Sequence, residues 1–106
     1  MISDERRDKA LEYLVTTDET AANLKADVAR AEYKAKAIKE AVYLRLDGSV
    51  ADRQAKAGQD AAYSEAMQMY FNLLGQAEYI KNKRQTESIV IDVWRSDHSD
   101  RKKGNI

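Results

Sequence analysis

The chain has 106 residues, with 18 basic and 18 acidic side chains, no cysteine and no proline. Its hydrophobic share of 43% is too high for a disordered chain and its charged share of 34% is high for a thick globular core, so the composition favours a thin helical bundle. It excludes disulfides and thiolate metal sites, offers no run of 18 apolar residues to span a membrane, and places no apolar signal-peptide core at the charged N-terminus.

Two helices are expected in the first half of the chain. A short helix over residues 1–17 can be capped by Ser3. Thr16 followed by Glu19 is a capping-box pattern, so a new helix is expected to begin there, with either a break or a kink at the joint. This long helix, over residues 18–47, is indicated by apolar residues spaced three and four apart: Leu24, Val28, Ala31, Ala35, Ile38, Val42 and Leu46.

The clearest break in the sequence is Asp47-Gly48-Ser49. Gly48 can adopt the left-handed conformation that ends a helix, and Ser49 can cap the next one. We expect a corner over residues 48–60, with a short helix from Val50 to about Ala57 and Asp60 as the cap of the last helix. That helix is expected over residues 61–98, followed by a frayed basic tail over residues 99–106.

The last helix carries more apolar surface than one neighbour can cover. One stripe consists of Tyr63, Met67, Tyr70, Leu74 and Ala77. A second, adjacent stripe consists of Leu73, Ile80, Ile91 and Trp94. The β-branched run 89–94 is interpreted as helix, because a lone strand would have no pairing partner. We therefore predict one all-α domain over residues 1–106: an antiparallel hairpin of two long helices with a short N-terminal helix and a short helical corner. The second stripe would be a protein interface in a homo-oligomer.

Groups that could carry catalysis are scarce. His98 is the only histidine, and a solvated side chain is favoured over a metal ligand. The four glycines lie apart, so there is no phosphate-binding loop, and no Glu-x-x-His pair marks a di-iron bundle. We predict a protein that is not an enzyme and has no catalytic residue, metal or cofactor.

Basic residues near aromatic rings are the remaining pattern. Mixtures of this kind bind single-stranded nucleic acid, with cations on phosphates and rings under bases. Tyrosine at helical spacing is also typical of a core edge, so both interpretations stay open. The DNA-binding candidates are Arg53, Lys56, Lys81, Lys83, Arg84, Arg95, Arg101, Lys102 and Lys103.

Three segments resemble small helical proteins of tailed bacteriophages. They are Tyr13–Glu19, Gly48–Ala57 and Val93–Ser96, the last with the basic residues 101–104 behind it. That family is associated with recombination and replication modules. The layout of long helix, glycine-containing corner, charged short helix and long helix is also similar to UvsY-type recombination mediators, which form rings, bind single-stranded DNA and help load a recombinase. The resemblance implies that Arg53, Lys56 and the basic C-terminal residues face DNA.

The expected function is that of a phage accessory protein of DNA recombination or replication, acting in the host cytoplasm. It would bind single-stranded DNA, a phage or host recombination protein, or both, as an oligomer and away from membranes. The alternative is a protein interaction module, such as an inhibitor of a host defence or host enzyme complex. The chain departs from UvsY-type proteins in its zero net charge, which weakens the case for strong unassisted DNA binding.

Overall fold

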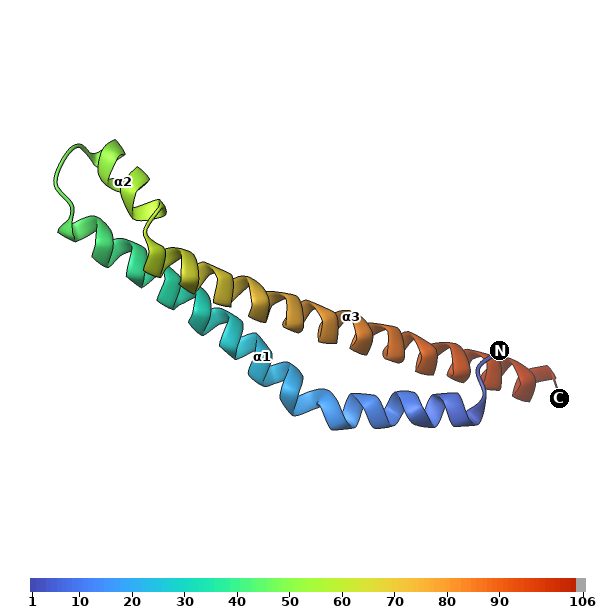
Figure 1. Ribbon diagram of the computed structural model, residues 1–106. Helices are drawn as coiled ribbons and strands as arrows, with labels where there is room; N and C mark the ends of the chain where they lie inside the picture. Colours follow the sequence, from blue (N-terminus) through green and yellow to red (C-terminus); the bar gives the residue numbers. More distant parts are fainter. Residues whose placement is uncertain (105–106) are drawn as a thin grey trace. The chain divides into compact units, whose positions relative to one another are not determined.

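The computed structural model describes the backbone of residues 1–104 and the side chains of residues 1–101. It contains helices α1 (Asp4–Arg45), α2 (Val50–Gly58) and α3 (Ala61–Gly104) (Figure 1). No strand occurs within residues 1–104, so the all-α prediction is confirmed. The contacts gather into two compact units, and each long helix contributes to both. Unit 1 joins Met1–Ala22 to the chain from Glu78 onward, and unit 2 is Asn23–Ala77.

In unit 1 the first part of α1 packs antiparallel to the last part of α3. Contact partners move backward along α3 as they move forward along α1: Asp4 meets Trp94, Arg6 meets Glu87, and Leu14 meets Arg84. Ala10 is fully buried at the centre of this packing. Around it, larger apolar side chains such as Leu14, Ile80 and Ile91 are half-buried, so unit 1 combines apolar packing with several polar contacts.

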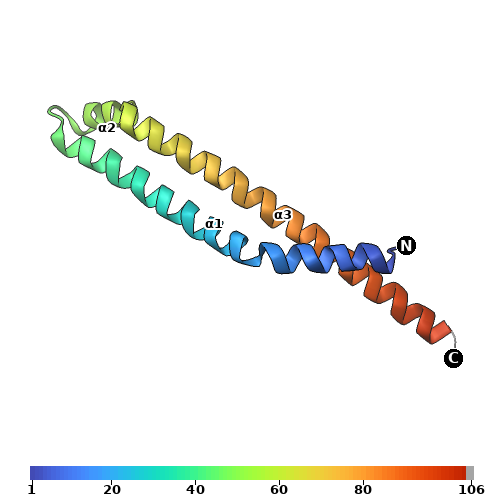
Figure 2. The same cartoon turned by 60° about the horizontal axis from the view of Figure 1, so that its bottom comes forward.

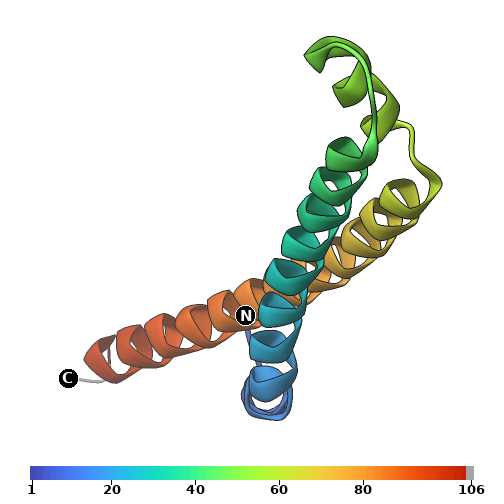
Figure 3. The same cartoon turned by 90° about the vertical axis from the view of Figure 1, so that its left-hand side faces the viewer.

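In unit 2 the rest of α1 runs beside the first part of α3, also antiparallel (Figure 2). Ala35 and Val42, both from the predicted heptad pattern, are buried. Figure 3 shows α2 between the end of α1 and the start of α3, where Ala57 is fully buried. The predicted hairpin and its helical corner are thus confirmed. The two most deeply buried residues of unit 2 are alanines, Ala35 and Ala57.

Local hydrogen bonds explain the corner. Gly48 has a φ of 120°, a conformation that L side chains rarely adopt. The Ser49 hydroxyl accepts a hydrogen bond from the Asp52 N–H at 3.1 Å, which caps α2. The Asp60 carboxylate likewise accepts from the Tyr63 N–H at 3.0 Å at the start of α3. Both predicted caps are confirmed.

Of the two alternatives for the joint between residues 17 and 18, a break between separate helices is wrong, because α1 continues from Asp4 to Arg45. The Thr16 hydroxyl donates to the Glu12 carbonyl at 2.8 Å, and the Thr17 hydroxyl donates to the Tyr13 carbonyl at 2.6 Å. Threonines whose hydroxyls bond back to the preceding turn can stay inside a helix, and no proline interrupts it. The residues that suggested a cap are therefore helix-interior residues.

The end predicted for the last helix is also wrong, because α3 extends to Gly104 rather than stopping near residue 98. The frayed tail expected over residues 99–106 is helical as far as Gly104, and Asn105 and Ile106 lie outside the described residues. The run 89–94 is helical, as predicted. No proline interrupts α3, and Gly75 lies inside the helix without ending it.

Candidate nucleic-acid and protein interaction sites

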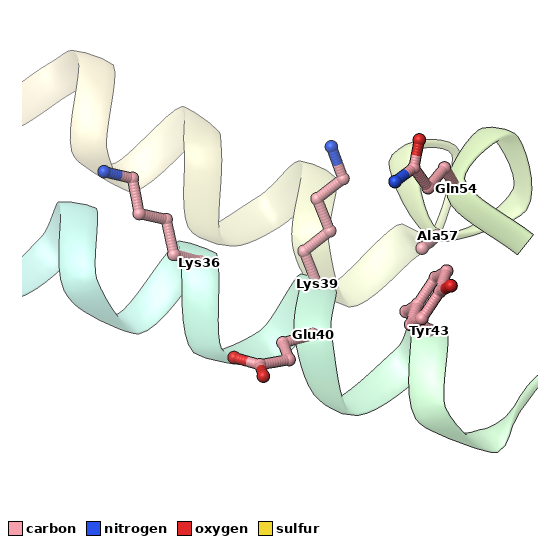
Figure 4. Close-up of a pocket in the computed structure, with 6 residues that line it drawn as sticks. All are labelled: Lys36, Lys39, Glu40, Tyr43, Gln54 and Ala57. Atoms are coloured by element: carbon pink, nitrogen blue, oxygen red, sulfur yellow. The ribbon is translucent and has the colours of Figure 1, made fainter. Parts of the chain in front are cut away.

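A pocket of about 360 Å³ opens in unit 2 between the end of α1 and α2. Figure 4 shows Lys36 and Lys39 extending to the same side of α1, while the Glu40 carboxylate points away from them. The Tyr43 ring stands beside Ala57, and the Gln54 amide reaches in from α2. We call this the corner pocket.

Two cations are held against the aromatic rings of this region. The Lys39 ammonium lies 5.3 Å from the centre of the Tyr63 ring, and the Arg53 guanidinium lies 4.1 Å from the centre of the Tyr43 ring. Arg53 also donates to the Tyr43 carbonyl from Nη2 at 3.0 Å and from Nε at 3.3 Å. Lys36 forms an ion pair with Glu32 at 3.0 Å. Arg53 thus closes the end of α1, while the two lysines line the pocket.

The chemistry of the corner pocket suits an anion with a flat group attached. The Lys36 and Lys39 ammonium groups can contact phosphate oxygens by exchanging their contacts with Glu32 and with the Tyr63 ring. The Tyr43 ring already carries the Arg53 guanidinium on one face, and the Gln54 amide can both donate and accept a hydrogen bond. The Glu40 carboxylate partly offsets the positive charge, so any anion binding here is expected to be weak and sensitive to salt.

Unit 1 contains an ion pair in which the carboxylate partner is buried and the arginine is partly exposed. The Arg6 guanidinium donates to both Glu87 carboxylate oxygens, from Nη1 at 2.6 Å and from Nη2 at 2.9 Å. Glu87 is 8% exposed, the only charged residue among the buried side chains of residues 1–101. The hydrogen bonds from Arg6 hold the pKa of Glu87 below its ordinary value, against the opposing effect of burial. The same bonds raise the pKa of Arg6.

Arg84 provides a second polar link between α1 and α3 in unit 1. Its Nη1 donates to the Leu14 carbonyl at 2.8 Å and to the Thr17 hydroxyl at 2.7 Å. Its Nη2 donates to the Asp18 carboxylate at 3.1 Å. Arg84 is one of the predicted DNA-binding residues, and its guanidinium bonds to α1 in the structure.

Trp94 lies in a stack at the far end of unit 1. Its indole N–H donates to Asp4 Oδ1 at 2.8 Å. The Arg7 guanidinium lies 4.3 Å from the ring centre, and the His98 ring stacks on the indole at 5.0 Å between centroids. His98 is therefore an exposed stacking partner.

The predicted DNA-binding residues are divided between the two units, with Arg53 and Lys56 in unit 2 and the others in unit 1. Lys83 lies over the Tyr13 ring at 4.7 Å, Arg95 approaches Asp92 at 3.8 Å, and Arg101 contacts the Met1 thioether. Lys56 on α2 and Lys81 on α3 are exposed. The side chains of Lys102 and Lys103 lie outside the described residues.

The four predicted interface residues are all half-buried on α3: Leu73, Ile80, Ile91 and Trp94. Sequence reasoning instead missed a set of large apolar side chains that are 53% to 77% exposed, among them Val15, Tyr33, Leu44, Phe71 and Tyr79. It also missed Gln54, Glu40 and the Arg6–Glu87 pair. The three- and four-residue spacing from Ile80 through Arg84 and Glu87 to Ile91 is the signal that could have placed Glu87 toward α1.

Comparison with protein-family models, with curated proteins and with solved structures finds no match to this chain. Among the residues that the structure describes, no group of three histidine, cysteine, aspartate or glutamate side chains could hold a metal ion. Nor does any helix in that part of the chain combine the length and apolar character that crossing a bilayer requires.

Proposed function

We propose that this chain is a non-catalytic accessory protein of phage DNA recombination or replication that binds single-stranded DNA weakly and acts as an oligomer. The corner pocket carries the proposal, because Lys36, Lys39, Tyr43 and Gln54 gather there from two helices. The resemblance of three segments to small phage proteins supplies the biological setting. Because a chain of zero net charge has little attraction of its own for DNA, the proposal includes a partner that adds affinity. We propose that this partner is a recombination protein.

A salt titration with a labelled single-stranded oligonucleotide of about 20 nucleotides tests this function. If two or three phosphates are contacted, the logarithm of the binding constant should fall against the logarithm of salt concentration with a slope between about −1.4 and about −2. Lys36→Ala and Lys39→Ala should each weaken binding several-fold at low salt. Lys25→Ala, which removes an exposed lysine of α1 away from the corner pocket, is the matched control.

Two results would count against DNA binding. One is the absence of any complex at low salt and high protein concentration. The other is an equal effect of Lys25→Ala and Lys39→Ala, which would indicate general attraction rather than a site. Circular dichroism of each variant should show wild-type helicity, so that a loss of binding is not a loss of fold.

A second candidate function is that of a protein interaction module, such as an inhibitor of a host defence or host enzyme complex. It is favoured by the exposed apolar side chains, since Val15 and Tyr33 are each 77% exposed. Under this function, Tyr33→Ser should weaken the complex with the partner protein, and oligonucleotide should not compete for it. Under the first function, oligonucleotide binding should be unaffected by Tyr33→Ser.

A further inference from the structure

A second concave surface of unit 2 lies between α1 and α3, away from the corner pocket. Its volume is about 270 Å³. Its apolar lining is mostly small: Ala31, Ile38, Ala62, Ala66 and Met69. We call this surface the alanine groove. Small side chains on two neighbouring helices leave a furrow in which the ridge of another helix can pack closely.

The lining of the alanine groove is only partly covered within the chain. Ala31, Ile38 and Ala66 are half-buried, and Met69 is 59% exposed. A pair of helices can cover only one face of each helix, whereas four helices enclose a common core. The groove therefore has the properties of one half of a helical bundle interface.

The charged residues at the two rims of the alanine groove indicate which molecule binds in it. Lys34 lies on the α1 rim and Glu65 on the α3 rim, and both are exposed. In a symmetric dimer with its two-fold axis along the groove, α1 of one copy faces α3 of the other. Because both residues line the same groove, Lys34 of each copy then meets Glu65 of its partner. This self-complementarity is what a two-fold interface requires.

We propose that the alanine groove binds a second copy of this chain, and that the two copies form an antiparallel four-helix bundle. The alanine-rich linings of the two grooves pack against each other in the core of the bundle. Two ion pairs, each between Lys34 of one copy and Glu65 of the other, lie at its edges. The inference deepens the assembly part of the proposed function and rests on it. It does not depend on DNA binding, because the groove and the corner pocket share no lining residue.

Charge reversal tests this interface by light scattering over a dilution series. Wild type should be dimeric, and Lys34→Glu and Glu65→Lys should each weaken self-association about ten-fold or more, because each places two like-charged pairs across the rims. An equimolar mixture of the two variants should recover the dimer, since every rim pair in the mixed dimer is again opposite in charge. Lys25→Glu changes net charge equally, lies outside the groove, and should leave the dimer intact.

Mixing the two variants distinguishes a contact between two copies of the chain from a contact within one copy. If the two rim charges only stabilised their own hairpin, both variants would lose helicity and mixing would restore nothing, which would overturn the proposal. Wild-type dimerisation by both variants would also overturn it, while leaving assembly through another face in place. A wild type that stays monomeric at every concentration would refute both the groove interface and the oligomeric part of the proposed function.

Discussion

Replacing Glu87 with glutamine removes a buried charge while keeping the size of the side chain. In the wild type, both Glu87 oxygens accept hydrogen bonds from Arg6. The glutamine amide that Glu87→Gln introduces can accept through only one oxygen, and it places an N–H₂ donor against the guanidinium, which is itself a donor. The variant therefore loses a bidentate contact between α1 and α3 without creating a cavity.

The expected loss of stability is moderate. Hydrogen bonds to a charged group contribute about 1.5–3 kcal/mol when the pair is shielded from water. The Arg6 side chain is 40% exposed, and solvent screening reduces that contribution, so we expect a loss of about 1 kcal/mol on replacing Glu87. For a domain of this size, that corresponds to a melting temperature lower by roughly 5 °C, measured by thermal circular dichroism at neutral pH.

The Arg6–Glu87 pair also predicts the direction in which stability changes with pH. The pKa of Glu87 is lowered in the folded chain, so its contribution is fully present above the unfolded pKa of about 4.3 and is lost as pH falls through the lower, folded value. The difference between wild type and Glu87→Gln should therefore shrink below about pH 4. A difference that stayed constant from pH 7 to pH 3 would refute the electrostatic explanation and leave only a packing effect.

Three further predictions concern the corner and the end of unit 1. Gly48→Ala should destabilise the chain by about 1 kcal/mol or more through backbone strain at a φ of 120°, and Ser49→Ala by about 1 kcal/mol through loss of the α2 cap, both measured by urea unfolding. If Gly48→Ala were neutral, the corner would not adopt this conformation in solution. Arg7→Ala should expose the single tryptophan, Trp94, and increase acrylamide quenching of its fluorescence, whereas Arg95→Ala should not. Equal quenching in both variants would contradict the Arg7–Trp94 stack.

The corner and the core of unit 2 could be predicted from sequence because local chemistry determines them. Gly48 and Ser49 specify a helix stop and a helix cap within two residues, and the structure has both. The joint near Thr16 could not be predicted in the same way. A threonine hydroxyl can cap a new helix or bond back to the preceding turn, and the sequence pattern is the same for both.

The candidate sites were less predictable because they depend on which charged side chains are already engaged within the chain. Lys83 and Arg84 are adjacent and basic, so sequence alone assigns them the same role. In the structure, Lys83 lies over the Tyr13 ring and Arg84 bonds to Leu14 and Thr17 of α1. Only the pairing of distant segments distinguishes a residue that is available for DNA from one that holds two helices together.

The two units differ in how they join α1 to α3, and the difference suggests separate roles. Unit 1 uses directional polar contacts, namely the Arg6–Glu87 pair and the Arg84 hydrogen bonds. Each of these contacts can form at only one alignment of α1 against α3. A one-residue slip would leave Glu87 buried without its partner, which is costly, so these contacts both specify the pairing and stabilise it.

Unit 2 uses alanine-rich packing, in which Ala35 and Ala57 are buried and the alanine groove stays open. Packing of this kind has little directional preference and leaves apolar surface for other chains. The polar contacts of unit 1 therefore fix which residues of α1 and α3 face each other there. Both the corner pocket and the alanine groove are formed within unit 2. Variants of unit 1 such as Glu87→Gln should accordingly reduce stability, whereas variants such as Lys39→Ala and Lys34→Glu should change binding and assembly without unfolding the chain.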